Sequence, residues 1–73
     1  MNTLRHEIET NGTSSFGRDF DNVRAIAFKV AEDHSGTEVT VNDDRMYLKV
    51  VARCNGAALR DLINALDRAG YLD

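Results

Sequence analysis

The chain has 73 residues, 42% of them hydrophobic and 29% charged, which predicts a single small domain over residues 1–73. Its formal net charge of −3 argues against a protein that binds nucleic acid through a basic surface. One cysteine, Cys54, excludes an intrachain disulfide, and two histidines, His6 and His34, are too few for a structural zinc site. Packing and self-association are therefore the expected means of stabilising so small a domain.

The sequence offers no segment suited to a membrane. No uncharged apolar run approaches the length of a membrane span. The first seven residues contain no apolar stretch of the kind found in a secretory signal. We therefore expect a cytoplasmic protein with no membrane partner.

The first predicted element is a strand over residues 3–10. Its side chains alternate, with Leu4 and Ile8 on one side and charged residues on the other, although the same two residues also permit one amphipathic helical turn. Residues 11–18 contain two glycines, two serines and a threonine, which predict a flexible connector. A ligand-binding loop is the less common alternative for such a segment.

A first helix is predicted over residues 21–34. Apolar residues recur there at the spacing of one helix face: Val23, Ile26, Ala27 and Val30. Asp21 is the expected N-cap and Asp19 the competing one, because a short polar side chain can accept from the free amides of the first turn. Gly36 is the expected residue at which the chain leaves the helix.

The last predicted element is a helix over residues 56–69. Its apolar face is the sharpest pattern in the chain: Leu59, Leu62, Ile63 and Leu66. Asn55 is the expected N-cap, and Gly70 predicts a Schellman-type exit in which Tyr71 packs on Leu66.

Between the helices, residues 37–54 predict a β-hairpin. A two-residue loop at Asp43–Asp44 pairs Val41 with Met46, Val39 with Leu48 and Thr37 with Val50 on the apolar side, and Glu38 with Lys49 and Thr40 with Tyr47 on the polar side. Because Asp-Asp is not a favoured turn, a longer loop over 42–45 stays open.

The second strand of the hairpin extends past its partner over residues 51–54, and those residues need another neighbour. The N-terminal strand is the candidate within the chain, which predicts an α+β fold of order β-α-β-β-α. Its antiparallel three-stranded sheet has the order 1-3-2, with both helices on one face. This arrangement resembles a ferredoxin-like split β-α-β fold that lacks its last strand.

The residues capable of chemistry each have a simpler structural interpretation. Cys54 precedes a predicted helix, where a thiol can be activated, but the strand alternation places it in the core. His6 and His34 lie in no ligand or catalytic pattern. The acidic pairs fit strand, cap and turn positions and lack calcium-loop spacing: Glu7/Glu9, Asp19/Asp21, Glu32/Asp33 and Asp43/Asp44. We therefore expect no enzyme activity, no cofactor and no metal.

The function favoured by the sequence is binding to another protein. Strands 1 and 2 are both edges of the predicted sheet, and an open edge can pair with a second copy or with a target. The expected contact residues lie on the first strand and at the end of the chain: Arg5, Glu7, Glu9, Tyr71 and Leu72. A self-associating regulator, inhibitor or adaptor of a larger assembly fits this pattern, with Leu72 as an otherwise exposed apolar tail.

Two alternatives concern nucleic acid. Tyr47, Lys49 and Arg53 are predicted on the open sheet face, where an aromatic residue among basic ones can bind a single strand. Glutamates predicted on the same face, with the net charge, weigh against this interpretation. The other alternative is that the scattered carboxylates imitate phosphates and occupy a basic groove of a partner.

Overall fold

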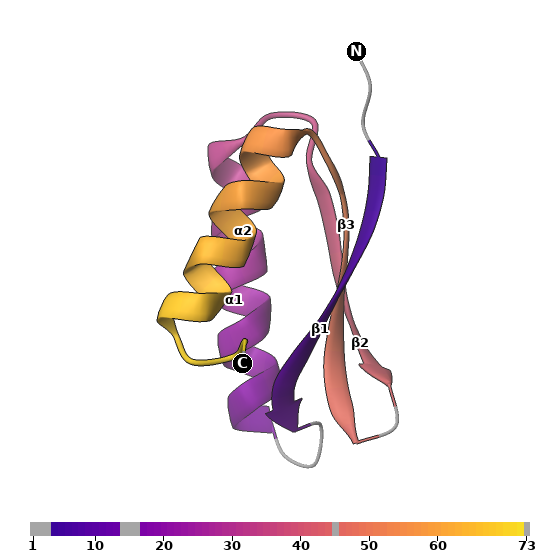
Figure 1. The fold of residues 1–73 in the computed structure, drawn as a ribbon, viewed down its shortest axis with the longest axis vertical. Helices are drawn as coiled ribbons and strands as arrows, with labels where there is room; N and C mark the ends of the chain where they lie inside the picture. The colour runs from indigo at the N-terminus through magenta and orange to yellow at the C-terminus, as the bar shows by residue number, and fades with distance from the viewer. Residues whose placement is uncertain (1–3, 14–16, 45, 73) are drawn as a thin grey trace.

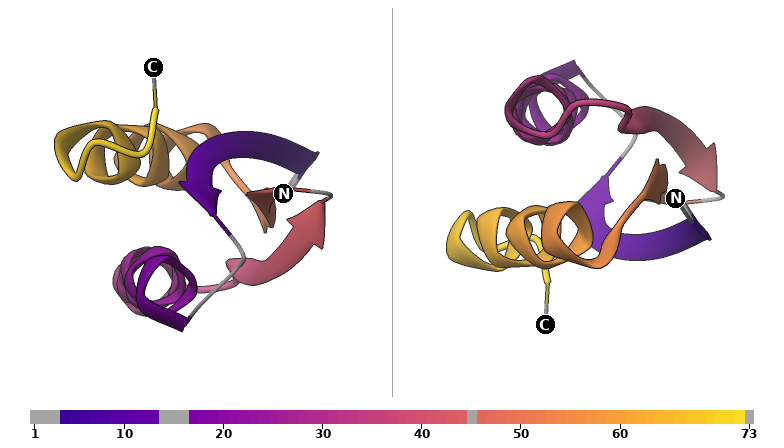
Figure 2. Two further views of the ribbon diagram at one scale, coloured as in Figure 1. Left: turned by 90° about the horizontal axis from the view of Figure 1, so that it is seen from below. Right: turned by 90° about the horizontal axis from the view of Figure 1, so that it is seen from above.

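The computed structural model describes residues 4–13, 17–44 and 46–72. Along the chain these residues form β1 (Leu4–Thr13), α1 (Gly17–Asp33), β2 (Glu38–Asp44), β3 (Tyr47–Cys54) and α2 (Gly56–Arg68). The three strands form an antiparallel sheet in the order β1-β3-β2. Both helices cover one face of this sheet (Figures 1 and 2), so the predicted fold class and strand order are confirmed.

The core lies between the sheet and the two helices. α1, α2 and β3 each bury side chains there, at the helical spacing in the helices and at every second residue in β3. The buried set is Val23, Ala27, Val30, Leu48, Val50, Ala52, Cys54, Ala58, Leu62 and Leu66. Alternation along β3 thus leaves Tyr47, Lys49 and Arg53 on the opposite face, away from the helices, as predicted.

The segment between β1 and α1 is shorter than the predicted loop over 11–18. β1 continues through Thr13 with an irregularity in its pairing to β3 between Glu9 and Thr13, and residues 14–16 lie outside the described part of the chain. The buried Thr10 holds this irregularity, because its hydroxyl donates to the Leu48 carbonyl (2.9 Å) and accepts from the Gly12 amide (3.2 Å).

The predicted start of the first helix is wrong by four residues. α1 begins at Gly17, so neither Asp21 nor Asp19 is its N-cap. Asp19 lies in the first turn instead, and its carboxylate accepts from the Thr13 amide (2.9 Å) and hydroxyl (3.2 Å). The Asp19 carboxylate thus joins β1 to α1, and in the sequence such an aspartate near the start of a helix cannot be distinguished from an N-cap.

The register of the β2–β3 hairpin also differs from the prediction. Val41 lies opposite Val50 and Val39 opposite Ala52, a displacement of four residues along β3 from the predicted pairs. An even displacement leaves every side chain on its expected face, so alternation alone could not detect it. The observed register pairs β2 along nearly all of β3 and sets Glu38 opposite Arg53 rather than Lys49.

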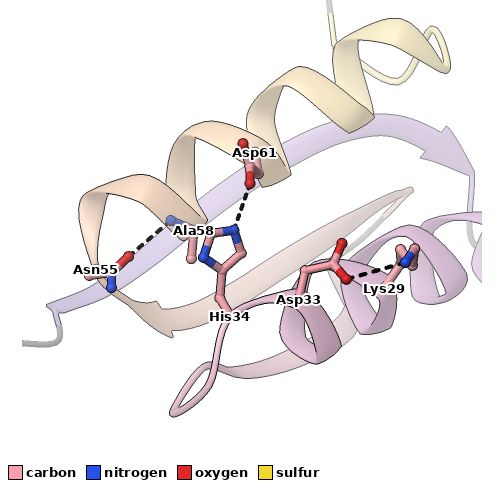
Figure 3. A network of polar contacts seen from close by, with 6 residues as sticks. All are labelled: Lys29, Asp33, His34, Asn55, Ala58 and Asp61. Atoms are coloured by element: carbon pink, nitrogen blue, oxygen red, sulfur yellow. Dashed lines mark hydrogen bonds and ion pairs between the residues drawn. The ribbon is translucent and has the colours of Figure 1, made fainter.

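The predicted ends of α2 are confirmed. The Asn55 side chain accepts from the Ala58 amide at 2.9 Å (Figure 3). After Ala69, Gly70 has a φ of 86°, its amide donates to the Asp67 carbonyl (3.0 Å) and the Tyr71 amide donates to the Leu66 carbonyl (2.9 Å). These are the two hydrogen bonds of a Schellman motif, and they direct Tyr71 back toward the core.

One further contact joins the two helices. His34, just after α1, lies with its Nε2 2.6 Å from an Asp61 carboxylate oxygen on α2 (Figure 3). His34 thus connects the end of α1 to α2, and its acidic partner was not predicted. Among the described residues, neither helix is long and apolar enough to cross a membrane.

Candidate functional site

The sheet has two edge strands, β1 and β2. The outer side of β1 is covered by another segment at one end and, among the described residues, has no strand beside it at the other. β1 pairs with β3 on one side only, from Leu4 opposite Cys54 to Glu9 opposite Lys49, and again at Thr13 opposite Tyr47. In the described part of the chain no strand lies along its other side. An edge of this kind presents backbone amides and carbonyls that another strand can pair with.

The C-terminal end of β1 is closed by the tail that follows α2. The Asn11 amide donates to the Tyr71 carbonyl (2.9 Å), and the Asn11 side chain donates to the Gly70 carbonyl (3.0 Å). The Tyr71 hydroxyl accepts from the Asn22 side chain (3.0 Å) and donates to Asp19 (3.4 Å). The part of β1 left open for pairing therefore runs from Leu4 to Thr10; we call it the β1 rim.

This tail corrects one expectation about the end of the chain. Tyr71 and Leu72 are half-buried and pack against the core, so Leu72 is not an exposed apolar tail. The Schellman motif turns the chain back over the open edge of the core, where both side chains reach apolar neighbours. The tail therefore exposes less surface for a partner than was predicted, and the remaining predicted contact residues lie on β1.

Charges of both signs lie along the side of the β1 rim that faces away from the helices: Arg5, Glu7 and Glu9. Arg5 forms an ion pair with Glu7, and Lys49 on β3 donates to the other Glu7 oxygen at 3.1 Å. The hydrogen bond from Lys49, followed by that from Arg5, holds the pKa of Glu7 below its ordinary value of 4.5. Glu7 is therefore an anion flanked by two cations on this surface at neutral pH.

A groove of about 610 Å³ lies beside the end of the β1 rim. Its walls come from β1, from the start of β3 and from the C-terminal tail: Glu9, Thr10, Asn11, Tyr47, Tyr71 and Leu72. The groove thus unites Glu9, Tyr71 and Leu72 of the predicted protein-binding set with Tyr47 of the predicted nucleic-acid set. Its aromatic walls suit an apolar side chain, and Glu9 adds a negative charge.

The predicted nucleic-acid face carries charges of both signs. Tyr47, 49% exposed, and Arg53 share that face with Lys49. Lys49, however, is half-buried and bound to Glu7, and the register places Glu9 opposite it. A phosphate backbone approaching this face would therefore meet carboxylates as well as cations.

Cys54 and the other candidate groups remain apart from the groove. Cys54 is 2% exposed, and desolvation raises the pKa of its thiol, so the reactive thiolate is disfavoured. His6 lies on β1 opposite Ala52, far along the sequence from the His34–Asp61 contact. Among the described residues, no three His, Cys, Asp or Glu side chains gather closely enough to hold a metal ion.

Sequence reasoning missed Thr10 and Asn11, both of which shape the groove. Thr10 continues the alternation of Leu4, His6 and Ile8, so its burial could have been predicted from strand parity. Asn11 precedes a glycine and has the pattern of a turn, and nothing local indicates its contact with the tail. No protein-family model, no curated protein and no solved structure matches this chain.

Proposed function

We propose that this protein is a non-enzymatic binding module whose β1 rim accepts a strand from another protein. The observation that carries this proposal is the open backbone from Leu4 to Thr10, which lies between an exposed apolar side chain at one end and a groove at the other. Leu4 is 63% exposed although it lies on the apolar side of β1. A strand added beside it would cover this surface.

Strand addition would divide binding into two contributions. Backbone hydrogen bonds along the rim supply affinity without regard to sequence, whereas side chains at alternate positions supply specificity. At the groove, Tyr47, Tyr71 and Leu72 can surround one apolar side chain, and Glu9 can pair with a cation beside it. A small module of this kind can regulate or inhibit a larger assembly, or act as its adaptor, by binding one of the assembly's strands. The cytoplasmic location of this protein stays a prediction.

The test uses peptides selected from a random library against the immobilised protein. We expect the selected peptides to bind in extended form and to protect the β1 amides from hydrogen exchange. Leu4→Lys should weaken their binding about tenfold, because it removes the exposed apolar contact and adds a charge at the edge. Mass spectrometry of exchange and calorimetry would measure both effects.

The matched control is Met46→Lys. Met46 is 69% exposed and lies beside the turn at the opposite end of the sheet from Leu4, so the substitution has the same chemistry and leaves the rim unchanged. Equal loss of binding in both variants, or peptides that leave β1 exchange unaltered, would contradict strand addition. Tight binding of single-stranded oligonucleotides that is lost in Lys49→Ala would favour the nucleic-acid alternative instead.

A further inference from the structure

We infer that the strand that occupies the β1 rim is the same rim of a second copy, paired antiparallel about a twofold axis at His6. This inference rests on the proposed function, since it names the partner of the same edge. A twofold contact uses one surface on both copies, so the sequence of the rim must be complementary to its own reverse. The β1 rim meets that requirement in one register.

With the axis at His6, residues equally distant from it lie opposite each other. Arg5 then faces Glu7 of the second copy, and Leu4 faces Ile8 of the second copy. The same two pairs occur again on the other side of the axis. Every charged residue between Leu4 and Ile8 therefore meets the opposite charge, and each apolar residue meets an apolar one.

The neighbouring registers lack this complementarity. An axis at Arg5 sets that cation against its own copy, and an axis at Glu7 or Glu9 does the same with a carboxylate. An axis at Ile8 sets Glu7 against Glu9. Like charges directly opposite each other destabilise an antiparallel pair, so these registers are disfavoured. The closed end of β1, where Asn11 bonds to the tail, excludes registers still farther along.

The charges already in place favour the same arrangement. Within one copy Glu7 is bound by Arg5 and Lys49, which leaves Arg5 with further donors on its guanidinium. Across the axis, the two Arg5–Glu7 pairs would form a ring of alternating charge. Leu4, the exposed apolar side chain of the rim, would be covered by Ile8 of the second copy. Because paired edges alone bury little area, we expect a dimer that dissociates on dilution.

The experiment inverts one charge at a time and then mixes the two variants. In Arg5→Glu the axis gathers four carboxylates, and in Glu7→Arg it gathers four cations, so each variant alone should associate at least about tenfold more weakly than the native chain. Mixed together, they restore both opposite-charge pairs and should form a heterodimer. Both variants lack the Arg5–Glu7 pair within one chain, so only contact between chains can restore association.

Sedimentation equilibrium of the isolated and mixed variants gives the readout, with thermal unfolding by circular dichroism as the check that each is folded. Glu9→Gln is the matched control, because Glu9 lies outside the pairs of the His6 register but faces Arg5 when the axis is at Glu7. Loss of dimer in Glu9→Gln would overturn the register. A native chain that stays monomeric at millimolar concentration, or that forms species larger than a dimer, would overturn the second copy as partner. Peptide binding at the rim tests the proposed function separately from this result.

Discussion

The two edges of the sheet differ in the charges that they present. β2 (Glu38–Asp44) has acidic residues and no basic one, so pairing it with a second copy offers no opposite-charge pair at any register. β1 carries Arg5 among glutamates and exposes Leu4. Charged side chains are one means by which natural sheets protect their edges against pairing, and the acidic residues of β2 are of this kind. The proposed pairing therefore finds opposite charges on β1 and none on β2.

A second contrast lies within β1 itself. Its C-terminal end is joined to the tail through Asn11, Gly70 and Tyr71, and this contact links β1, α1 and α2. Its N-terminal end has only β3 beside it among the described residues. The proposed pairing with another chain is therefore confined to the β1 rim, which limits the number of possible registers.

The largest effect is expected from opening the closed end. Tyr71→Ala removes the packing of the aromatic ring and the hydroxyl contacts to Asn22 and Asp19, and should lower the free energy of unfolding by about 2–3 kcal/mol. The Asn11 amide, released from Tyr71, should exchange faster with solvent. Urea unfolding and hydrogen exchange measure the two consequences.

Tyr71→Phe is the matched variant, because it keeps the ring and removes the hydroxyl. We expect a loss of about 1 kcal/mol and little change at Asn11. If both variants exchange Asn11 as slowly as the native protein, the tail does not close β1.

A smaller effect concerns the link between β1 and α1, and it depends on pH. The hydrogen bond from the Thr13 amide, the largest cause, keeps the pKa of Asp19 below its ordinary value of 3.8. Stability from this carboxylate is therefore fully present above that value and is lost as the pH falls through the lower pKa of the folded state. Asp19→Asn should lower the melting temperature at neutral pH and make it less sensitive to acid.

Melting temperatures measured from neutral to strongly acidic pH would test this effect. Asp21→Asn is the control, because Asp21 is exposed and lies in the same helix without a contact to Thr13. Identical acid sensitivity of the two variants would show that Asp19 does not link β1 to α1.

The smallest effect is expected on the other edge. Glu38→Gln removes one exposed carboxylate from β2 and should change the free energy of unfolding by no more than about 0.5 kcal/mol. Association should also stay unchanged, since the proposed dimer does not involve β2. A dimer strengthened or lost through this substitution would show that β2, not β1, is the pairing edge.

Sequence patterns predicted the elements, because these follow from periodicity. The strand order is also confirmed, but its premise was wrong: residues 51–53 do not extend past β2 and pair with it instead. The cap at Asn55 is a local feature and is where it was expected. Of the predicted apolar face of α2, Leu62 and Leu66 are buried, whereas Ile63 is 39% exposed. The hairpin register was wrong because Val39 and Val41 keep their face under any even displacement along β3. The turn residues could not decide it, since Asp43–Asp44, the predicted turn, is unfavoured as a turn and lies within β2.

The candidate site was predicted only in part. Arg5, Glu7 and Glu9 lie on the open edge as expected, because strand alternation and strand order place them there. The closed end could not be predicted, since Asn11 and Tyr71 are brought together by the whole fold rather than by any local pattern. The groove depends on that contact, so its shape was beyond the reach of the sequence.

The most direct test of a β1 rim that pairs with another strand is nuclear magnetic resonance of the native chain, diluted from millimolar to micromolar concentration. We predict that the amide signals from Leu4 to Ile8 shift on dilution while those of β2 remain constant. Signals of β2 that shift while those of β1 stay constant would contradict pairing at the β1 rim. So would a spectrum that does not change on dilution, if the selected peptides also fail to bind at β1.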